Sequence, residues 1–456
     1  MKNILSLLFI LAPMIMLAQT PWISSSDKDI FIRNVNLVPM DSERIIESQD
    51  LVIRAGKILQ YGLTGVLKPG KDDMVINGTG KYLMPGLGEM HAHVPPVADM
   101  EPMKEVLTLF ALNGVTTIRG MLGHPQHLIL RNKIQSGEII GPRFITSGPS
   151  FNGNSVKTAE QGALMVEEQK KAGYDFLKLH PGLTPLTFGA IAQKAHELNI
   201  PFSGHVSYTV GVWRAIDAGY ATIDHMDGFI ESLVPGIENI AESDAGLFGM
   251  FIGYRADMSK LPTLLKALKE KKIWVVPTQC LSEKWFSPED PETLAKAPEL
   301  IYIDQPTRAK WVQSKKDLLQ NPKYNAAEIM KFIELRRKLV LACQTSGVKI
   351  LLGSDAPQVF DVPGFSTHDE LAYYVAAGLT PYQALQTGTV NVGEFLGIKD
   401  LGLIKSGAPA DLILLSGNPL KSIDATRKIE GVIMNGKWIA KNTISTELKK
   451  LEKTGH

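Results

Sequence analysis

Cysteine is nearly absent from this sequence, and so is any excess of charge. The 456 residues include two cysteines, Cys280 and Cys343, which can form at most one disulfide and lie in no motif typical of metal ligation. Lysine and arginine number 48 against 47 aspartates and glutamates, a net charge of +1. Without a field of one sign, nothing attracts nucleic acid or an anionic membrane surface. We therefore predict no nucleic-acid partner.

A hydrophobic run long enough to span a membrane is also missing from the first residues. Lys2 is followed by a largely apolar stretch from Ile4 to Leu17, and Ala18 supplies a small residue at a plausible cleavage point. The stretch is shorter than the roughly 20 residues that a span needs, and Pro13 interrupts it. This pattern predicts a signal peptide over residues 1–19 and an exported protein, periplasmic or secreted, without a stable membrane anchor.

Both ends of the remaining chain have the composition of β-strands. Stretches rich in β-branched residues occupy 29–38 and 50–62 near the start, and 410–419 and 431–439 near the end. Asn435-Gly436 is a strong hairpin signal. Neither end has enough strands to bury its own apolar face, so we predict one small β-sandwich built from residues 20–85 and 401–456.

Strand and helix patterns alternate between these ends, which is typical of a parallel sheet with crossover helices. We expect helices at Thr158–Gly173, Leu186–Leu198 and Ala326–Gly347, with Gly173 and Gly347 as helix stops. The eight strand candidates end near His91 to His93, Arg119, Gly148, Lys178, His205, His225, Thr278 and Asp355. The pattern predicts an α/β fold, a (β/α)8 TIM-like barrel over residues 86–400.

The longest interruption of this alternation is the polar, proline-bearing segment from Ser282 to Asn325. It is either a surface excursion or a lid over the barrel mouth, and the sequence leaves both open.

Two histidines, His91 and His93, follow an apolar strand with a spacing of i, i+2. On a strand this spacing points both imidazoles the same way, so that both can ligate one metal ion. The pair alone does not establish a metal site.

Further polar residues fall at the carboxyl ends of the other predicted strands. Taken singly, each has a structural explanation, as a paired lysine, a core histidine or a loop-capping aspartate. Together they lie on the rim that carries the chemistry in this fold, and they predict a catalytic centre. They are Lys178, His205, His225 and Asp355.

Several longer motifs accompany these residues. They are Leu-Met-Pro-Gly-Leu-x-x-Met-His-Ala-His at 83–93, Asn-Gly-Val-Thr-Thr-Ile-Arg at 113–119, Gly-Ser-Asp at 353–355, Gly-Leu-Thr-Pro-Tyr-Gln-Ala-Leu from 378 and Gly-Ala-Pro-Ala-Asp-Leu from 407. With them the chain resembles the amidohydrolase superfamily, in its binuclear metal-dependent branch that is prolidase-like or imidazolonepropionase-like. Two positions depart from the usual pattern, Glu89 and Gly120, where the family usually has aspartate.

The resemblance implies a site for two divalent metals, with Zn²⁺ the first choice and Mn²⁺ or Co²⁺ as alternatives. One metal would be held by His91, His93 and Asp355 and the other by His205 and His225. Lys178 would bridge them after carboxylation by carbon dioxide, because a carbamate offers two oxygens whereas an ammonium offers none.

The reaction implied is hydrolysis of a carbon–nitrogen bond. A hydroxide shared by metals about 3.5–4 Å apart would attack the carbonyl carbon, and Asp355 would shuttle the proton to the departing amine. Small substrates are expected, in particular dipeptides of the Xaa-Pro type. A cyclic-amide hydrolase, like imidazolonepropionase or hydantoinase, is the alternative, weakened because those relatives typically lack the bridging lysine.

Four residues could receive a substrate carboxylate or amine, and each is explained equally well by a structural role: His180, Tyr208, Tyr254 and Arg255. A catalytically dead secreted binding protein would be expected to have lost a ligand, and none is lost. A glycosidase needs two facing carboxylates, whereas this rim is mainly histidine. The sequence allows a homo-oligomer but does not predict one.

Overall fold

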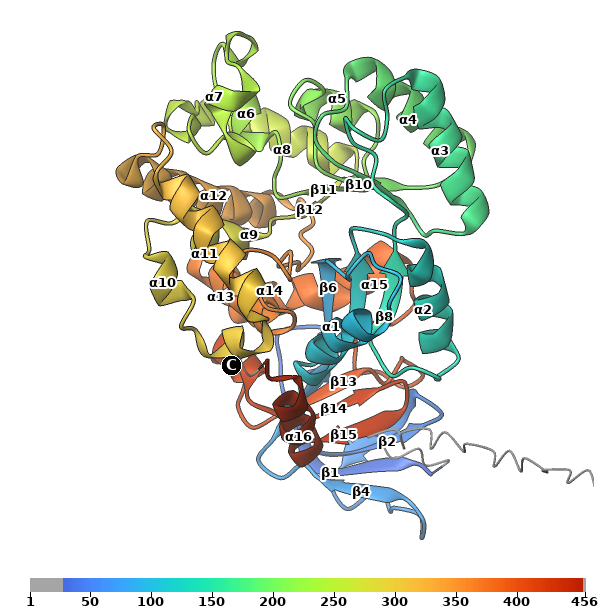
Figure 1. The fold of residues 1–456 in the computed structure, drawn as a ribbon. Helices are drawn as coiled ribbons and strands as arrows, with labels where there is room; N and C mark the ends of the chain where they lie inside the picture. The colour runs from blue at the N-terminus through green and yellow to red at the C-terminus, as the bar shows by residue number, and fades with distance from the viewer. Residues whose placement is uncertain (1–27, 454–456) are drawn as a thin grey trace, which may run out of the picture.

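The computed structural model describes residues 28–453 (Figure 1). The predicted signal peptide, residues 1–19, lies outside this range. Among the described residues, no helix combines the length and the apolar character needed to cross a membrane.

The two ends of the chain pair into one sheet of eight strands, at the bottom of Figure 1. Its first part contains β1 (Ile30–Leu37), β2 (Ile46–Arg54), β3 (Lys57–Leu63), β4 (Met74–Asn77) and β5 (Tyr82–Pro85), and its last part β13 (Leu412–Leu415), β14 (Ile429–Met434) and β15 (Lys437–Ala440). The order is β15-β14-β13-β5-β1-β2-β3, with β4 beside β1. β5 joins the two parts, since it pairs with β1 on one side and β13 on the other.

The predicted association of both termini is therefore found, but a β-sandwich is not confirmed. Part of the sheet packs against helices where a second sheet was expected. Val432 and Ile439 of the sheet share a core with Leu112 of α1 (Glu101–Leu112) and Ile444 of α16 (Lys441–Leu451).

Parallel strands and helices alternate in the middle of the chain. β6 (Leu87–Ala92), β7 (Val115–Gly120) and β8 (Arg143–Thr146) form one parallel sheet, and β9 (Leu177–Leu179), β10 (Phe202–Gly204), β11 (Thr222–Asp224) and β12 (Trp274–Val276) form another. The larger helices around them are α2 (Pro125–Gln135), α3 (Ala159–Ala172), α4 (Pro185–Glu197), α5 (Gly211–Asp217), α8 (Leu261–Glu270), α12 (Ala326–Ser346), α13 (Phe365–Ala376), α14 (Pro381–Gly388) and α15 (Val390–Leu396). The α/β class is confirmed.

The predicted helix ends are confirmed at their local signals. The side chain of Thr158 caps α3 by accepting a hydrogen bond from the amide of Gln161, and Gly173 ends the helix with φ 88°. Gly347 ends α12 in the same left-handed conformation, with φ 81°. Glycine adopts this conformation without the steric penalty of a Cβ, which is why it stops helices at this position.

A continuous eight-stranded barrel is not found among the described strands. A single bridge between Ser147 and Phe176 connects the two parallel sheets, and another between Val275 and Ile350 connects β12 to the segment of the expected eighth strand. The expected eighth strand forms no regular ladder. The amide of Leu351 donates to the carbonyl of Val275 in β12, but that of Leu352 donates to the carbonyl of Thr387 in α14. The segment still lies beside β6, since the amide of Met90 donates to the carbonyl of Leu352 at 2.7 Å.

The segment Ser282 to Asn325 is mostly helical. It contains η5 (Ser282–Phe286), α10 (Pro291–Leu294), η6 (Pro298–Tyr302) and α11 (Gln305–Leu319). Its apolar residues, including Leu300 and Trp311, pack against Val359 and Phe360, just beyond Asp355. A lid function for it stays a prediction. Cys280 and Cys343 are buried and free.

Candidate active site

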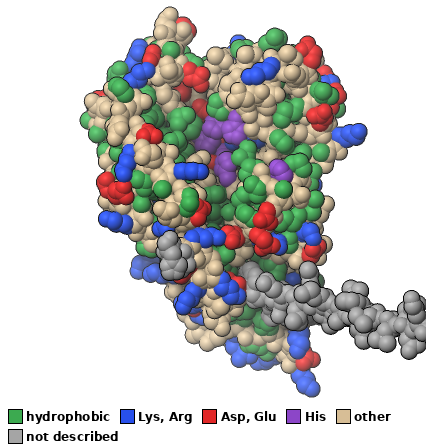
Figure 2. Space-filling model, in the orientation of Figure 1, with side chains coloured by type: hydrophobic (Ala, Val, Ile, Leu, Met, Phe, Trp, Pro, Cys, Tyr) green, Lys and Arg blue, Asp and Glu red, His purple; other side chains and the backbone are tan. Residues whose placement is uncertain are grey.

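Histidine side chains gather in a hollow of the α/β part (Figure 2). They come from the carboxyl ends of the parallel strands, as expected for this class of fold. β6 ends in the His91-Ala92-His93 segment, β10 leads into His205 and β11 into His225.

Asp355 meets both histidines of the first motif. Its Oδ1 lies 3.2 Å from Nε2 of His91 and 2.7 Å from Nε2 of His93. This oxygen is buried and has no partner with hydrogen-bond geometry. Lone pairs from the first and the last strand unit therefore converge on one point.

The other two histidines stack beside them. The ring centroids of His205 and His225 are 4.3 Å apart, and those of His91 and His225 are 4.5 Å apart. Burial lowers the pKa of His205 to about 3 and holds that of His225 well below its usual value. Both imidazoles are thus neutral near pH 7, the form in which histidine is a ligand.

Each buried histidine has a partner on its other ring nitrogen. Nδ1 of His205 lies 3.0 Å from Asp227, and Nδ1 of His225 lies 2.9 Å from Oγ1 of Thr278. These contacts leave Nε2 of His225 buried without a hydrogen-bond partner. Such partners fix the orientation of a ring whose remaining nitrogen faces the site.

A carboxylate lies close to His91 beneath the site, although Nδ1 of this ring makes no contact of hydrogen-bond geometry. Nδ1 of His91 lies 2.9 Å from Asp224, and the guanidinium of Arg119 lies 3.3 Å from the same carboxylate. Arg119 also donates to the carbonyl of Met90 at 2.7 Å. All of these side chains are almost fully buried, so a compensated pair of charges supports the first ligand from below.

Lys178 points into the same cluster. Its side chain is fully buried, and Nζ lies 3.4 Å from Nε2 of His91. In the described part of the chain no carboxylate forms an ion pair with it, and burial lowers its pKa to about 8. Gly204 leaves room for its stem, because a Cβ there would approach Cδ of Lys178 to 2.8 Å.

Three residues of the cluster have a left-handed backbone that is unusual outside glycine. The φ angles are 62° at His225, 47° at Thr278 and 71° at Asp355. For a β-branched residue such as Thr278 this conformation is a clear outlier. Strained residues of this kind concentrate at functional sites, where the surrounding structure holds them.

The donor set fits a divalent metal ion. Ligand atoms of His91, His225 and Asp355 lie within 4.8 Å of one another, and all three residues are buried. Two of their atoms, Nε2 of His225 and Oδ1 of Asp355, are buried without a hydrogen-bond partner, which a metal ion would supply. Nitrogen and oxygen donors suit zinc and its neighbours in the first transition row.

The sequence carries the same assignment, since the profile of the Amidohydrolase family matches residues 82–439. The chain belongs to the amidohydrolase family. It is a metal-dependent hydrolase that acts on carbon–nitrogen bonds.

Solved structures of other amidohydrolases share the fold. A putative prolidase from Bifidobacterium longum is 21% identical, with a TM-score of 0.68 over 93% of this chain and 99% of that one. The bottromycin amidohydrolase is 20% identical, with a TM-score of 0.71 over 95% of this chain and 92% of that one. An adenine deaminase from Ruegeria sp. (strain TM1040) is 35% identical over 69 residues, which cover 15% of this chain and 12% of the deaminase.

The two residues that depart from the family motifs, Glu89 and Gly120, both lie in closely packed surroundings in this amidohydrolase. Glu89 accepts hydrogen bonds from Ser354, from its amide at 2.6 Å and its hydroxyl at 3.0 Å, and from Thr367 at 2.8 Å. It thereby holds the loop that presents Asp355. At Gly120 a Cβ would come within 2.7 Å of Phe144.

The four residues expected to contact substrate lie in different places. The His180 ring stacks on His205 with centroids 5.1 Å apart. Tyr208 lines a cavity beside His205, and its hydroxyl donates to the carbonyl of Ile240. Tyr254 and Arg255, on η3 (Gly253–Arg255), are exposed and outside the lining of that cavity.

Sequence reasoning missed Asp224, Asp227 and Thr278. The first two flank His225 in the stretch Thr-Ile-Asp-His-Met-Asp, so two carboxylates beside a ligand histidine were a usable signal. Thr278 was placed at the end of a predicted strand, but nothing in the sequence indicated its contact with His225, which spans 53 residues.

Proposed function

We propose that this protein is an exported amidohydrolase that cleaves small amides, with dipeptides of the Xaa-Pro or a related type as the leading substrate class. The observation that carries the proposal is the convergence of His91, Asp355 and Lys178 on one buried point. The prolidase and Xaa-Pro dipeptidase among the structural neighbours support it by analogy. Export rests on the sequence of residues 1–19 alone.

The proposed centre holds two divalent metals, zinc first, at the carboxyl ends of the parallel strands. His91, His93 and Asp355 would hold one ion and His205 and His225 the other, with carboxylated Lys178 between them. When bound, the ions supply Lewis-acid polarisation of the scissile carbonyl and a hydroxide near neutral pH.

The side chains of the protein transfer the proton and orient the ligands. Asp355 takes the proton of the attacking water on its carboxylate and delivers it to the nitrogen of the departing amine. Asp227 and Thr278 hold their histidine rings in register, so the ligands need no rearrangement during the reaction. The burial of Lys178 favours its neutral amine, the form that adds carbon dioxide.

A cyclic-amide hydrolase remains the second candidate, and Lys178 separates the two. The buried position of Lys178, with no carboxylate partner among residues 28–453, supports the bridging role. The sequence-based interpretation that a bridging lysine disfavours a cyclic-amide hydrolase stays a prediction, which the substrate screen tests.

Elemental analysis followed by a hydrolysis screen tests the proposal. The purified protein is expected to hold close to two divalent metals per chain, and a dipeptide panel to be hydrolysed faster than hydantoins or imidazolonepropionate. A protein that stays folded and metal-free after metal loading, or that turns over only esters, lactones or sugars, would refute it.

A further inference from the structure

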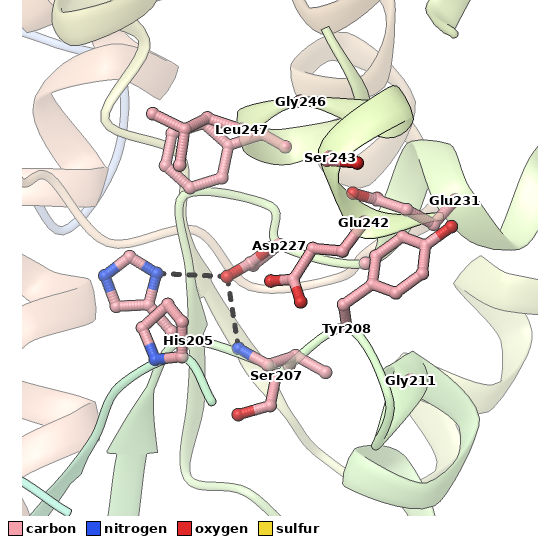
Figure 3. Close-up of a pocket in the computed structure, with 14 residues that line it drawn as sticks. His205, Ser207, Tyr208, Gly211, Asp227, Glu231, Glu242, Ser243, Gly246 and Leu247 are labelled. Carbon is pink, nitrogen blue, oxygen red and sulfur yellow. Dashed lines mark hydrogen bonds and ion pairs between the residues drawn. The ribbon is translucent and has the colours of Figure 1, made fainter. Parts of the chain in front are cut away.

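A cavity of about 430 Å³ opens beside His205 (Figure 3). Its size lies in the range of small-molecule sites. Three carboxylates line it, those of Asp227, Glu231 and Glu242, whereas no lysine or arginine does. Because His205 forms part of its wall, a ligand in this cavity lies next to the candidate metal centre.

The carboxylates of this cavity lack a cationic partner. Asp227 pairs with His205 at 3.0 Å. Glu231 and Glu242 form no ion pair with a lysine or arginine anywhere in residues 28–453. Moreover, Oε2 of Glu231 is buried and accepts no hydrogen bond. A buried carboxylate oxygen in this condition requires explanation, because its desolvation is not compensated.

The nearby guanidinium of Arg336 is not the cationic partner of these carboxylates. It donates to the carbonyls of His225 and Pro277, both at 2.7 Å, and to the side chain of Gln279 at 3.3 Å. Burial accordingly raises the pKa of Glu231 to about 8, in spite of Arg336. A cation placed in the cavity would favour the ionised carboxylate.

We propose that this cavity binds a cationic nitrogen group of the substrate, an ammonium or a guanidinium. The inference rests on the proposed amide hydrolysis and specifies its substrate class. Glu231 and Glu242 would form charge-assisted hydrogen bonds to the group, and Leu247 and Phe248 would cover an aliphatic stem. Tyr208 presents its ring in the same wall, held by the hydrogen bond of its hydroxyl to Ile240 at 2.8 Å.

The proposal refines the expectation that the site receives either a carboxylate or an amine. A substrate carboxylate in this cavity would face three acidic side chains and no lysine or arginine. The cation has two natural sources in a small peptide, the amino-terminal ammonium and the side chain of lysine or arginine.

Matched substrates distinguish these sources on the metal-loaded protein. Dipeptides Xaa-Pro with lysine, norleucine or glutamate at the first position are compared, each with a free and with an acetylated amino terminus. We expect kcat/KM to be higher for a cationic substrate than for its neutral match by about 10- to 100-fold, as for a hydrogen bond between charged groups. Loss of the preference on acetylation assigns the amino terminus, and loss on replacing lysine with norleucine assigns the side chain.

Removing the charge of Glu231 or Glu242 tests whether these residues bind the cationic group. Glu231→Gln should lower the ratio of kcat/KM between cationic and neutral substrates by about tenfold. Glu242→Gln should lower it less and in a salt-dependent way, because Glu242 is exposed and screened. The matched control is Asp244→Asn, which removes the same charge from the same helix, α7 (Glu242–Ala245), at a residue that pairs with Lys323 outside the cavity lining.

Binding of L-lysine and L-norleucine, compared by calorimetry on the metal-loaded protein, does not depend on turnover. If no amide is hydrolysed, the proposed function fails, while tighter binding of lysine that weakens in Glu242→Gln still supports the cavity assignment. If amides are hydrolysed with no preference for a cation, or with one for glutamate, the cavity assignment alone is overturned. The cavity assignment is also overturned if Asp244→Asn changes the ratio of kcat/KM between cationic and neutral substrates as much as Glu242→Gln does.

Discussion

Replacing Lys178 with alanine should empty the metal centre while leaving the fold nearly as stable as before. The change removes roughly three buried methylenes, at about 0.8 kcal/mol each, a loss of about 2–3 kcal/mol. It also removes a buried ammonium whose pKa has fallen from 10.5 to about 8. That shift corresponds to about 3 kcal/mol of unfavourable burial. The two effects nearly cancel, so the metal-free variant should unfold within about 1–2 kcal/mol of the metal-free parent.

The effect of Lys178→Ala should appear in the metal content and in the turnover. Two ions without a shared anion repel each other, so elemental analysis should fall from close to two metals per chain to one or fewer. A short carboxylic acid, supplied with excess metal, can offer two bridging oxygens in place of the carbamate and should restore part of the activity.

Lys315 provides a matched control. It too is a fully buried lysine, but its Nζ donates to the carbonyls of Lys284 at 2.6 Å and Ser287 at 2.7 Å. Lys315→Ala leaves these acceptors unsatisfied, so it should lower stability and spare the metals. If Lys178→Ala instead keeps two metals and near-parental turnover, the bridging role is refuted.

Three further changes test Asp355, Asp224 and His368. Asp355→Asn should reduce kcat by about 10²–10⁴-fold while a substrate analogue still binds, and a kcat near the parental value would exclude the proton shuttle. Asp224→Asn should weaken metal binding by about 10–100-fold through the loss of support for His91, measured by competition with a chelator; unchanged affinity would show that Asp224 acts only in folding. His368 in α13 is buried outside the site, with its ring nitrogens 2.9 Å from Oγ1 of Thr426 and 3.0 Å from the carbonyl of Asn113, and burial lowers its pKa to about 4. The unfolded chain therefore binds the extra proton below about pH 6.5, and stability should fall from there towards pH 4. His368→Gln should flatten the fall in stability with pH, measured by denaturation at several pH values. An unchanged pH dependence would show that His368 does not cause it.

Local signals explain what the sequence could predict. Gly173 and Gly347 end their helices as expected, because the preference of glycine for a left-handed helix stop depends on a few neighbouring residues. The predicted ligands His91, His225 and Asp355 come together because carboxyl ends of parallel strands share one edge, whatever lies between them in sequence.

Long-range contacts explain which features of the fold could not be predicted from the sequence. The apolar run at Leu351-Leu352 has the composition of a strand, yet the amide of Leu352 donates to Thr387 in a helix. The second sheet of a sandwich was inferred from apolar faces that require cover. The sequence did not reveal that α16 would supply part of that cover through Ile444.

The strained backbone of the site follows from its position where strands end. A strand that continued straight past His225 or Asp355 would direct alternate side chains to opposite faces. A left-handed residue at that point turns the chain so that the side chain faces the cluster, at a cost of about 1–3 kcal/mol each. Contacts formed only in the folded chain offset this cost. Arg336 holds the carbonyl of His225 at 2.7 Å, and Glu89 holds the amide of Ser354 beside Asp355 at 2.6 Å. The ligands are therefore aimed by buried side chains from distant parts of the sequence.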